Sequence, residues 1–152
     1  MHLSLRGQWY LTYTNFSMWK NPKVYNVTFN YTATQKDGIA CLLDEVKYVK
    51  GGKAGSIVGY DYIDSNDAHK LVWQGKGWMF WIKCPWKIEW VNNAQTCIVL
   101  SFEKTLLTGG GVDIVTRDKN PANEILDEAL AVIAGNEMLR TRGANSIRVV
   151  QR

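Results

Sequence analysis

The sequence has no apolar stretch that approaches the length of a membrane-spanning helix, so no membrane span is expected. Residues 1–6 also lack the apolar core of a secretory signal peptide, which favours a cytoplasmic protein, with a secreted mature form as the alternative. Runs of five or more like charges are missing, and the net charge is only +4 because acidic residues interleave with basic ones. A continuous basic surface is therefore not predicted, and we expect no nucleic-acid partner.

Residues that bind metals or act as strong nucleophiles are scarce. The three cysteines, Cys41, Cys84 and Cys97, have no metal-ligand spacing, and buried thiols are the simpler interpretation, although one disulfide would fit a secreted form. His69 is the only histidine beyond the N-terminal residues, and it falls in a polar turn. We therefore expect no metal site and no cofactor.

Aromatic residues, in contrast, are abundant. The chain has seven tryptophans and seven tyrosines in 152 residues. Such side chains fill protein cores, but they also line apolar ligand cavities, and composition does not distinguish the two uses. The length suits a single domain over residues 1–152.

Short segments of alternating apolar and polar residues, separated by turn residues, predict eight β-strands. The clearest alternation lies at 24–34, where Tyr25, Val27 and Phe29 share one face of the strand. The expected strands are 8–15, 24–34, 39–49, 56–63, 69–74, 86–91, 96–104 and 112–117. Nearly every connection has hairpin length, which favours an antiparallel up-and-down β-barrel over a sandwich, since closure removes the exposed edge strands.

The C-terminal part has a different pattern. Asn120 as N-cap, Pro121 at the first helical position and Gly135 as a stop signal predict one amphipathic helix at about 121–134. A short final strand is expected at about 145–151. The sequence thus predicts an all-β barrel at about 7–118 with one C-terminal helix.

The first strand and the end of the eighth carry a family likeness. Gly7-x-Trp9, Arg117 and the helix that follows it resemble the lipocalins, and the likeness spans almost the whole chain. It implies that Trp9 closes the narrow end of the barrel and that Arg117 packs across it, as a structural floor. A guanidinium over an indole face is also favourable in its own right. Residues 92–96 lack the Asp and Tyr of the family's middle motif, so the chain resembles a divergent member.

If the first strand starts at the closed end, the connections 16–23, 49–55, 75–85 and 105–111 lie at the open end. Two of these connections are rich in aromatic residues, and large apolar groups on exposed loops favour a ligand-gating role. The expected ligand-binding residues near the mouth are Met18, Trp19, Tyr25, Trp78, Phe80, Trp81 and Trp86. Those expected deeper in the barrel are Tyr13, Val27, Phe29, Tyr60, Trp73, Ile88 and Leu100, with Phe102 as a further candidate.

The resemblance and the aromatic load together predict that the barrel binds a small hydrophobic or aromatic molecule. The alternative is a cofactor-free cyclase or isomerase acting on a hydrophobic substrate in the same cavity. Its candidate catalytic residues are Asp61, Asp113, Tyr60 and Cys41. A third interpretation, a protein-interaction barrel that uses its aromatic rim as an interface, predicts a stable homodimer and no internal cavity.

Overall fold

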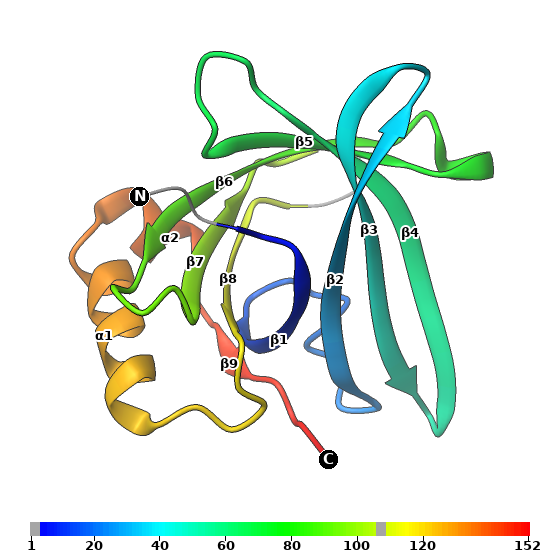
Figure 1. Ribbon diagram of the computed structural model, residues 1–152. Coiled ribbons are helices and arrows are strands. Elements are labelled where there is room, and N and C mark those ends of the chain that lie inside the picture. Colours follow the sequence, from blue (N-terminus) through cyan, green and yellow to red (C-terminus); the bar gives the residue numbers. More distant parts are fainter. Residues whose placement is uncertain (1–3, 106–108) are drawn as a thin grey trace.

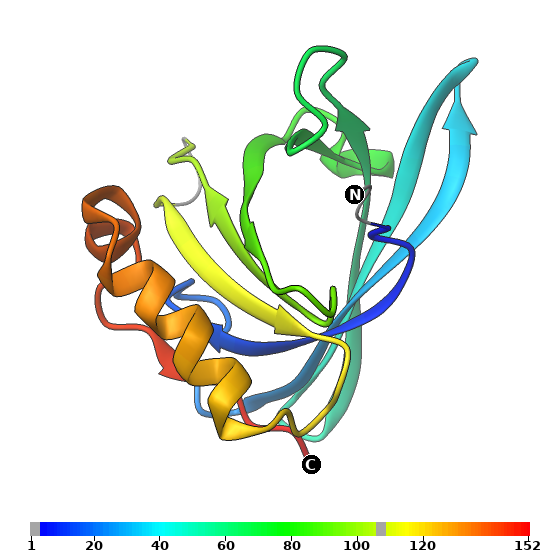
Figure 2. The ribbon, with the colours of Figure 1, turned by 60° about the vertical axis from the view of Figure 1, so that its left-hand side comes forward.

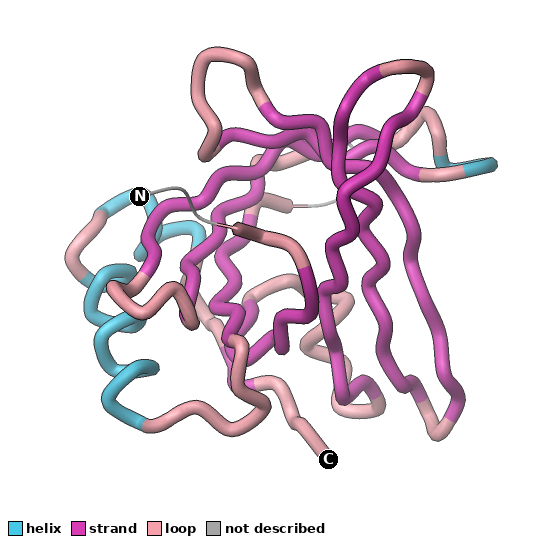
Figure 3. Tube along the Cα trace, in the orientation of Figure 1, coloured by secondary structure: helices cyan, strands magenta, loops and turns pink. Residues whose placement is uncertain are grey.

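Period-two segments at regular spacing fold into antiparallel strands that follow one another around a barrel (Figure 1). The computed structural model describes residues 4–105 and 109–152. The strands are β1 (Gly7–Thr14), β2 (Val24–Lys36), β3 (Ile39–Lys50), β4 (Lys53–Ile63), β5 (Lys70–Gly75), β6 (Lys83–Val91), β7 (Cys97–Phe102), β8 (Gly111–Thr116) and β9 (Ile147–Arg148). A short 3-10 helix, η1 (Gly77–Met79), lies between β5 and β6. The β-rich tube and its outer helices are separated by colour in Figure 3.

The sheet closes because β1 pairs on both sides. Strands β2 to β8 pair in chain order, β8 pairs with β1, and the first half of β1 pairs with β2. The second half of β1 pairs instead with β9, which extends the sheet beside the barrel. This arrangement confirms the predicted eight-stranded antiparallel up-and-down barrel. Residues 106–108, which belong to the expected connection 105–111, lie outside the described residues.

The helices α1 (Asn123–Ala134) and α2 (Glu137–Arg142) lie outside the barrel, as Figure 2 shows for α1. Helix α1 buries Leu126 and Ala129 against the outer faces of β7 and β8, where they pack with Cys97, Val99, Val112 and Ile114. The outward residues of these two strands are therefore as buried as the inward ones. None of the helices formed by residues 4–105 and 109–152 has the length and apolar character needed to cross a bilayer.

The C-terminal prediction needs three corrections. Helix α1 ends at Gly135 as expected but begins at Asn123, with Ala122 in place of Asn120 as N-cap. Helix α2 was not predicted, although Asn136 caps it by accepting a hydrogen bond from the Leu139 N–H. The final strand is two residues long, because only Ile147 and Arg148 reach the free half of β1.

Irregular pairing interrupts three strands. The register shifts between residues 11 and 13 of β1, 25 and 28 of β2, and 88 and 90 of β6. An extra residue in one strand reverses which of the following side chains face inward. These β-bulges decide the orientation of several residues that strict alternation assigned to the barrel interior.

The Gly7-x-Trp9 stretch packs against Arg117. The Arg117 Cζ atom lies 3.7 Å from the centroid of the fully buried Trp9 ring, and the Trp9 Nε1–H donates to the Leu5 carbonyl at 2.9 Å. The guanidinium also donates to the Ser4, Arg6 and Gln8 carbonyls, which ties the N-terminal segment to the end of β8. Gly7 has a φ of +96°, and a Cβ there would lie 3.0 Å from Arg117 Nη1. Glycine is therefore needed for both backbone conformation and space.

Candidate ligand-binding cavity

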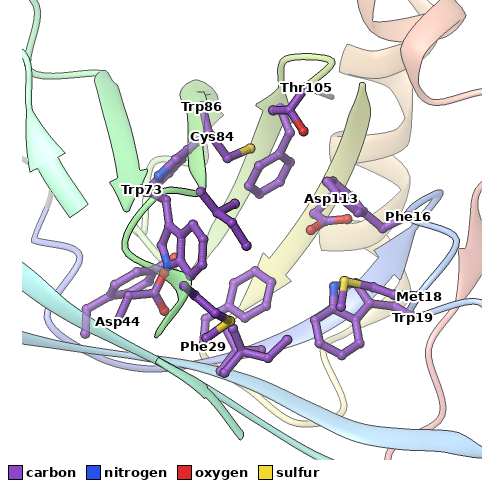
Figure 4. Close-up of a pocket in the computed structure, with 16 residues that line it drawn as sticks. Phe16, Met18, Trp19, Phe29, Asp44, Trp73, Cys84, Trp86, Thr105 and Asp113 are labelled. Atoms are coloured by element: carbon purple, nitrogen blue, oxygen red, sulfur yellow. The ribbon is translucent and has the colours of Figure 1, made fainter. Parts of the chain in front are cut away.

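A cavity of about 240 Å3 is lined by residues from several strands and connections of the barrel (Figure 4). Residues of the β1–β2 connection, the segment between β5 and β6, and Thr105 are among those that line it. The lining side chains are Phe16, Met18, Trp19, Phe29, Tyr31, Asp44, Val46, Ile57, Trp73, Met79, Ile82, Cys84, Trp86, Phe102, Thr105 and Asp113. Most of them are apolar or aromatic, as is usual for sites that bind small organic molecules.

A series of aromatic rings forms one side of the cavity. Tyr31 and Trp86 stack at 6.3 Å between centroids, Trp86 and Phe102 stack at 6.1 Å, and Phe102 meets the edge of Phe16 at 5.0 Å. These rings come from β2, β6, β7 and the β1–β2 connection, so only closure of the barrel brings them together. The result is a rigid wall suited to a flat apolar molecule.

Gly59 positions another aromatic side chain of the wall. A Cβ at Gly59 would lie 2.4 Å from the Trp73 indole, so the ring of Trp73 lies directly against the β4 backbone. Gly59 is also the register partner of Asp44 on β3. The Trp73 ring thus occupies the space that a side chain at this position would need.

Three carboxyl groups are buried inside the barrel. The exposed fractions are 6% for Asp44, 0% for Asp61 and 1% for Asp113. Asp44 and Asp113 line the cavity, and Figure 4 places them on opposite sides of it. Each of the three has one carboxyl oxygen without a hydrogen-bond partner among residues 4–105 and 109–152. A buried polar atom left in this way is costly, so these oxygens are the most unusual feature of the interior.

Asp44 and Asp61 interact with each other. They are diagonal neighbours on the inner face of β3 and β4, because Leu42 pairs with Asp61 and Asp44 pairs with Gly59. Asp61 Oδ1 accepts a hydrogen bond from Trp86 Nε1 at 2.8 Å. Burial raises the pKa of Asp61 to about 6, and burial together with the neighbouring Asp61 raises the pKa of Asp44 well above its usual range. Burial and the closeness of the two groups therefore both disfavour a second negative charge in this pair.

Asp113 lies on β8 between Thr14 of β1 and Leu100 of β7. Its Oδ1 accepts a hydrogen bond from the Thr14 hydroxyl at 2.6 Å, and that hydroxyl in turn accepts from the Phe16 N–H. Burial raises the pKa of Asp113 to about 7, although the Thr14 hydrogen bond opposes the shift. Asp113 therefore titrates near neutral pH with its second oxygen unpaired in the described structure.

Five of the expected ligand-binding residues line the cavity. These are Met18, Trp19, Phe29, Trp73 and Trp86. Three others, Val27, Ile88 and Leu100, are buried in the same core but do not reach the cavity wall. They point inward as expected, but they belong to the packed part of the core and not to the cavity wall.

Tyr13, Tyr25 and Tyr60 do not line the cavity, contrary to expectation. The bulge in β1 turns Tyr13 toward the helices, where it packs on the outer cluster, and the bulge in β2 leaves Tyr25 outside under the Arg152 guanidinium at 4.3 Å. On β4 the prediction placed the wrong set of alternate residues on the inner face. Asp61 is the inward residue, so its neighbour Tyr60 faces out, with Lys36 Nζ 5.8 Å from its ring.

The aromatic loop after β5 is also oriented differently from the expectation. Trp78, Phe80 and Trp81 are largely exposed to solvent and do not line the cavity. Their loop neighbours Met79 and Ile82 do line it. The short η1 turn separates these side chains, because consecutive residues of a helical turn point in different directions.

Of the four candidate catalytic residues, only some lie at or near the cavity. Asp113 lines the cavity and Asp61 lies behind Asp44, whereas Tyr60 and Cys41 do not line it. Cys41 lies on the opposite face of β3 from Asp44, and burial raises the pKa of its thiol, which disfavours the nucleophilic thiolate. Cys41, Cys84 and Cys97 are all free thiols. Within the described ranges no cluster of three or more metal-binding side chains occurs.

Sequence reasoning missed several residues of the cavity. Tyr31 and Val46 were available from alternation, since each follows inward residues at a spacing of two. Asp44 is among the acidic residues, with Glu45, Asp61 and Asp113, that the sequence allows to point inward, and it lies at an inward position between Leu42 and Val46. Phe16, Ile57, Met79, Ile82, Cys84 and Thr105 line the cavity as well, but they come from loops or strand ends that carry no regular pattern.

The closed eight-stranded up-and-down barrel, with a cavity and a helix packed outside, is the architecture that the family resemblance of the sequence implies. Searches with the sequence found no matching protein-family model and no matching curated protein.

Solved structures do match. Lobster apocrustacyanin A1 has a TM-score of 0.67 at 17% identity, with 97% of this chain and 77% of that chain covered. Insecticyanin from the tobacco hornworm Manduca sexta has a TM-score of 0.69 at 11% identity, covering 95% and 77%. The siderocalin Ex-FABP has a TM-score of 0.70 at 10% identity, covering 97% and 93%. The chain therefore has the lipocalin fold, which confirms the predicted resemblance.

Proposed function

We propose that this protein binds a small, predominantly apolar molecule inside the barrel and acts as a carrier or binding protein. The observation that supports this most directly is the aromatic cavity of about 240 Å3. An apolar protein cavity of about 150 Å3 accommodates benzene, so a molecule of roughly one or two rings matches this volume. The siderocalin Ex-FABP, which shares the fold, functions through dual ligand specificities. The interpretation as a solid protein-interaction barrel predicted no cavity, and the cavity argues against it.

Native mass spectrometry of the purified protein, combined with extraction of any bound compound, tests the proposal. We expect a bound species that denaturation releases, or, for an empty protein, saturable binding of a one- or two-ring compound such as 1-naphthylamine. The proposal fails if no compound co-purifies and if neither 1-naphthylamine nor other apolar compounds of this size change the tryptophan fluorescence.

Filling the cavity provides a first mutational prediction. Ile57 lines the cavity on β4, and Ile57→Trp should weaken 1-naphthylamine binding at least about tenfold, because the larger ring occupies the space the ligand needs. Fluorescence titration measures the effect. The matched control is Ile63→Trp on the exposed end of the same strand, which should leave binding unchanged. Equal affinity of both variants would place the binding site elsewhere.

A cofactor-free isomerase or cyclase is the second candidate, and the buried carboxyl groups favour it. General acid–base catalysis requires groups that titrate near the working pH, and the pKa values of Asp61 and Asp113 are raised to about 6 and about 7. Incubation of the protein with its recovered ligand distinguishes the two functions. A ligand recovered with an altered structure would establish catalysis, and an unaltered ligand supports carriage.

A homodimer is a separate proposal that concerns the exposed loop after β5. Trp78 is 77% exposed, and Phe80 and Trp81 are also largely exposed, which is unusual for a group of adjacent aromatic residues. We expect the wild-type protein to self-associate through this loop and the triple variant Trp78→Ser, Phe80→Ser, Trp81→Ser to sediment as a monomer. Because these side chains lie outside the cavity, its affinity for 1-naphthylamine should stay within about threefold. A wild-type protein that sediments as a monomer at high concentration would refute the dimer.

A further inference from the structure

The two carboxyl groups that line an otherwise apolar cavity identify the ligand more closely. We propose that the cavity binds an arylalkylamine in its protonated form, with the ammonium group held by Asp113 and the ring against the aromatic wall. This inference rests on the proposed binding function and specifies its ligand. It follows from the position of Asp113, a residue that lines the cavity, is 1% exposed, and has its Oδ2 buried without a hydrogen-bond partner among the described residues.

An apolar ligand without a hydrogen-bond donor would leave the buried carboxyl oxygens without a hydrogen-bond partner. Burying a carboxyl oxygen with no hydrogen bond costs free energy, and a ligand that donates to it removes that cost. An ammonium group supplies both a donor and a compensating charge. Because the protein has already removed Asp113 from water, only the desolvation of the amine is added on binding.

Asp113 is a better anchor for the ammonium group than Asp44. Asp44 is adjacent to Asp61, and burial together with that neighbouring carboxyl group raises the pKa of Asp44 and so disfavours its charged form. Asp113 lies across the cavity from that pair, with Thr14 as its hydrogen-bond donor, and it can ionise independently. Figure 4 shows Phe16 on the same side as Asp113, where an aromatic ring adds attraction for a cation. Asp44 then remains available to a second donor group of the ligand.

None of the other titratable groups of the described residues around the cavity supplies a positive charge to balance the Asp113 carboxylate. Tyr31 lines it from β2 and Cys84 from β6, and burial raises the pKa of Tyr31 well above its usual range and that of Cys84 to about 11, so both stay neutral. Asp44 and Asp61 on β3 and β4 add negative character. None of the described residues that line the cavity is a lysine, arginine or histidine. The cavity therefore favours a cation over a neutral or anionic ligand of the same shape.

Three indoles of similar size test the proposal by isothermal titration calorimetry. Tryptamine carries the ammonium group, 3-ethylindole is its neutral counterpart and indole-3-acetate is an anion. At about pH 8 we expect tryptamine to bind at least about tenfold more tightly than 3-ethylindole, and indole-3-acetate to bind most weakly. Equal affinity for tryptamine and 3-ethylindole would overturn the amine proposal but leave the binding function intact. If none of the three binds, the binding function itself is refuted for ligands of this size.

The variant Asp113→Asn locates the anchor. We expect it to lose the preference for tryptamine while its affinity for 3-ethylindole stays within about threefold, because the amide retains the shape of the cavity but not the charge. Asp127→Asn, on the exposed face of α1, is the matched control and should behave as wild type. A preference for tryptamine that survives in Asp113→Asn but is lost in Asp44→Asn would assign the ammonium to Asp44 and overturn the role of Asp113. Circular dichroism verifies that each variant is folded.

The pH dependence provides a readout that a purely structural role of Asp113 would not produce. Ammonium binding requires the carboxylate, and the pKa of free Asp113 is about 7. Tryptamine affinity should therefore fall about tenfold from pH 8 to pH 6, with uptake of about one proton by the buffer on binding at pH 6. The 3-ethylindole affinity should stay nearly constant over this range. A tryptamine affinity that is independent of pH in this interval contradicts an ionising anchor.

Discussion

Replacing Trp9 with alanine should lower the melting temperature by about 10–15 °C. The indole is fully buried, donates to the Leu5 carbonyl and carries the Arg117 guanidinium 3.7 Å above its ring. Removal of a buried tryptophan costs about 3–5 kcal/mol, and each kcal/mol shifts the midpoint of a protein of this size by about 2–4 °C. Differential scanning calorimetry measures the change.

The exposed Trp78 supplies the control for this prediction. Trp78→Ala deletes an indole side chain that is exposed to solvent, and it should leave the melting temperature unchanged within about 1 °C. A double-mutant cycle between Trp9→Ala and Arg117→Met should give a coupling energy of about 0.5–2 kcal/mol from the stacked pair. An unchanged melting temperature for Trp9→Ala would refute the role of Trp9 in closing the floor of the barrel.

Asp113→Asn should stabilise the protein increasingly as the pH rises. The folded-state pKa of Asp113 is about 7, well above the ordinary value of 3.8 for an aspartate in the unfolded chain, so between these values the folded protein binds a proton that the unfolded chain has lost. Stability then falls as the pH rises through this window, and the full cost is present above pH 7. A tenfold change in proton affinity is worth about 1.4 kcal/mol, so the total reaches about 4 kcal/mol.

Urea denaturation at pH 4 and pH 8.5 measures this difference. The free energy of unfolding of Asp113→Asn relative to wild type should rise by about 4 kcal/mol between the two pH values, and any cost of burying the amide adds a constant at both. Asp127→Asn on exposed α1 should show no such change. If the difference between Asp113→Asn and wild type does not depend on pH, Asp113 is not a buried acid that the fold keeps protonated.

Much of the fold could be predicted because its signals are local. Turn residues such as Gly38, Gly51 and Gly52, all with positive φ, mark the hairpins β2–β3 and β3–β4 where glycine is conformationally required. The strand order follows from hairpin-length connections, and closure follows from the need to pair the two edges. Gly135, another local signal, follows directly after the last residue of α1 as its C-cap. These features depend on residues that are neighbours in the sequence.

The assignment of side chains to the cavity was less successful because β-bulges are not encoded by alternation. A single extra residue near Thr12 turns Tyr13 to the helices and brings Thr14 inward to bond Asp113. Similar shifts displace Tyr25 and turn Trp90 to the outer cluster around α1. A pattern of period two predicts which residues share a face only as long as the register is continuous. The cavity wall therefore could not be read from the strands one at a time.

The sequence by itself determined the number and order of the strands and the position of one outer helix, whereas the pairing of Trp9 with Arg117 was implied by the family resemblance. It did so because turn chemistry, period-two alternation and helical spacing act between nearby residues. Only the tertiary structure decided that Asp44, Asp61 and Asp113, from three separate strands, lie inside one apolar barrel. It also decided that Trp78, Phe80 and Trp81 lie outside the cavity. Burial and proton affinity depend on neighbours across the closed sheet, which no local pattern specifies.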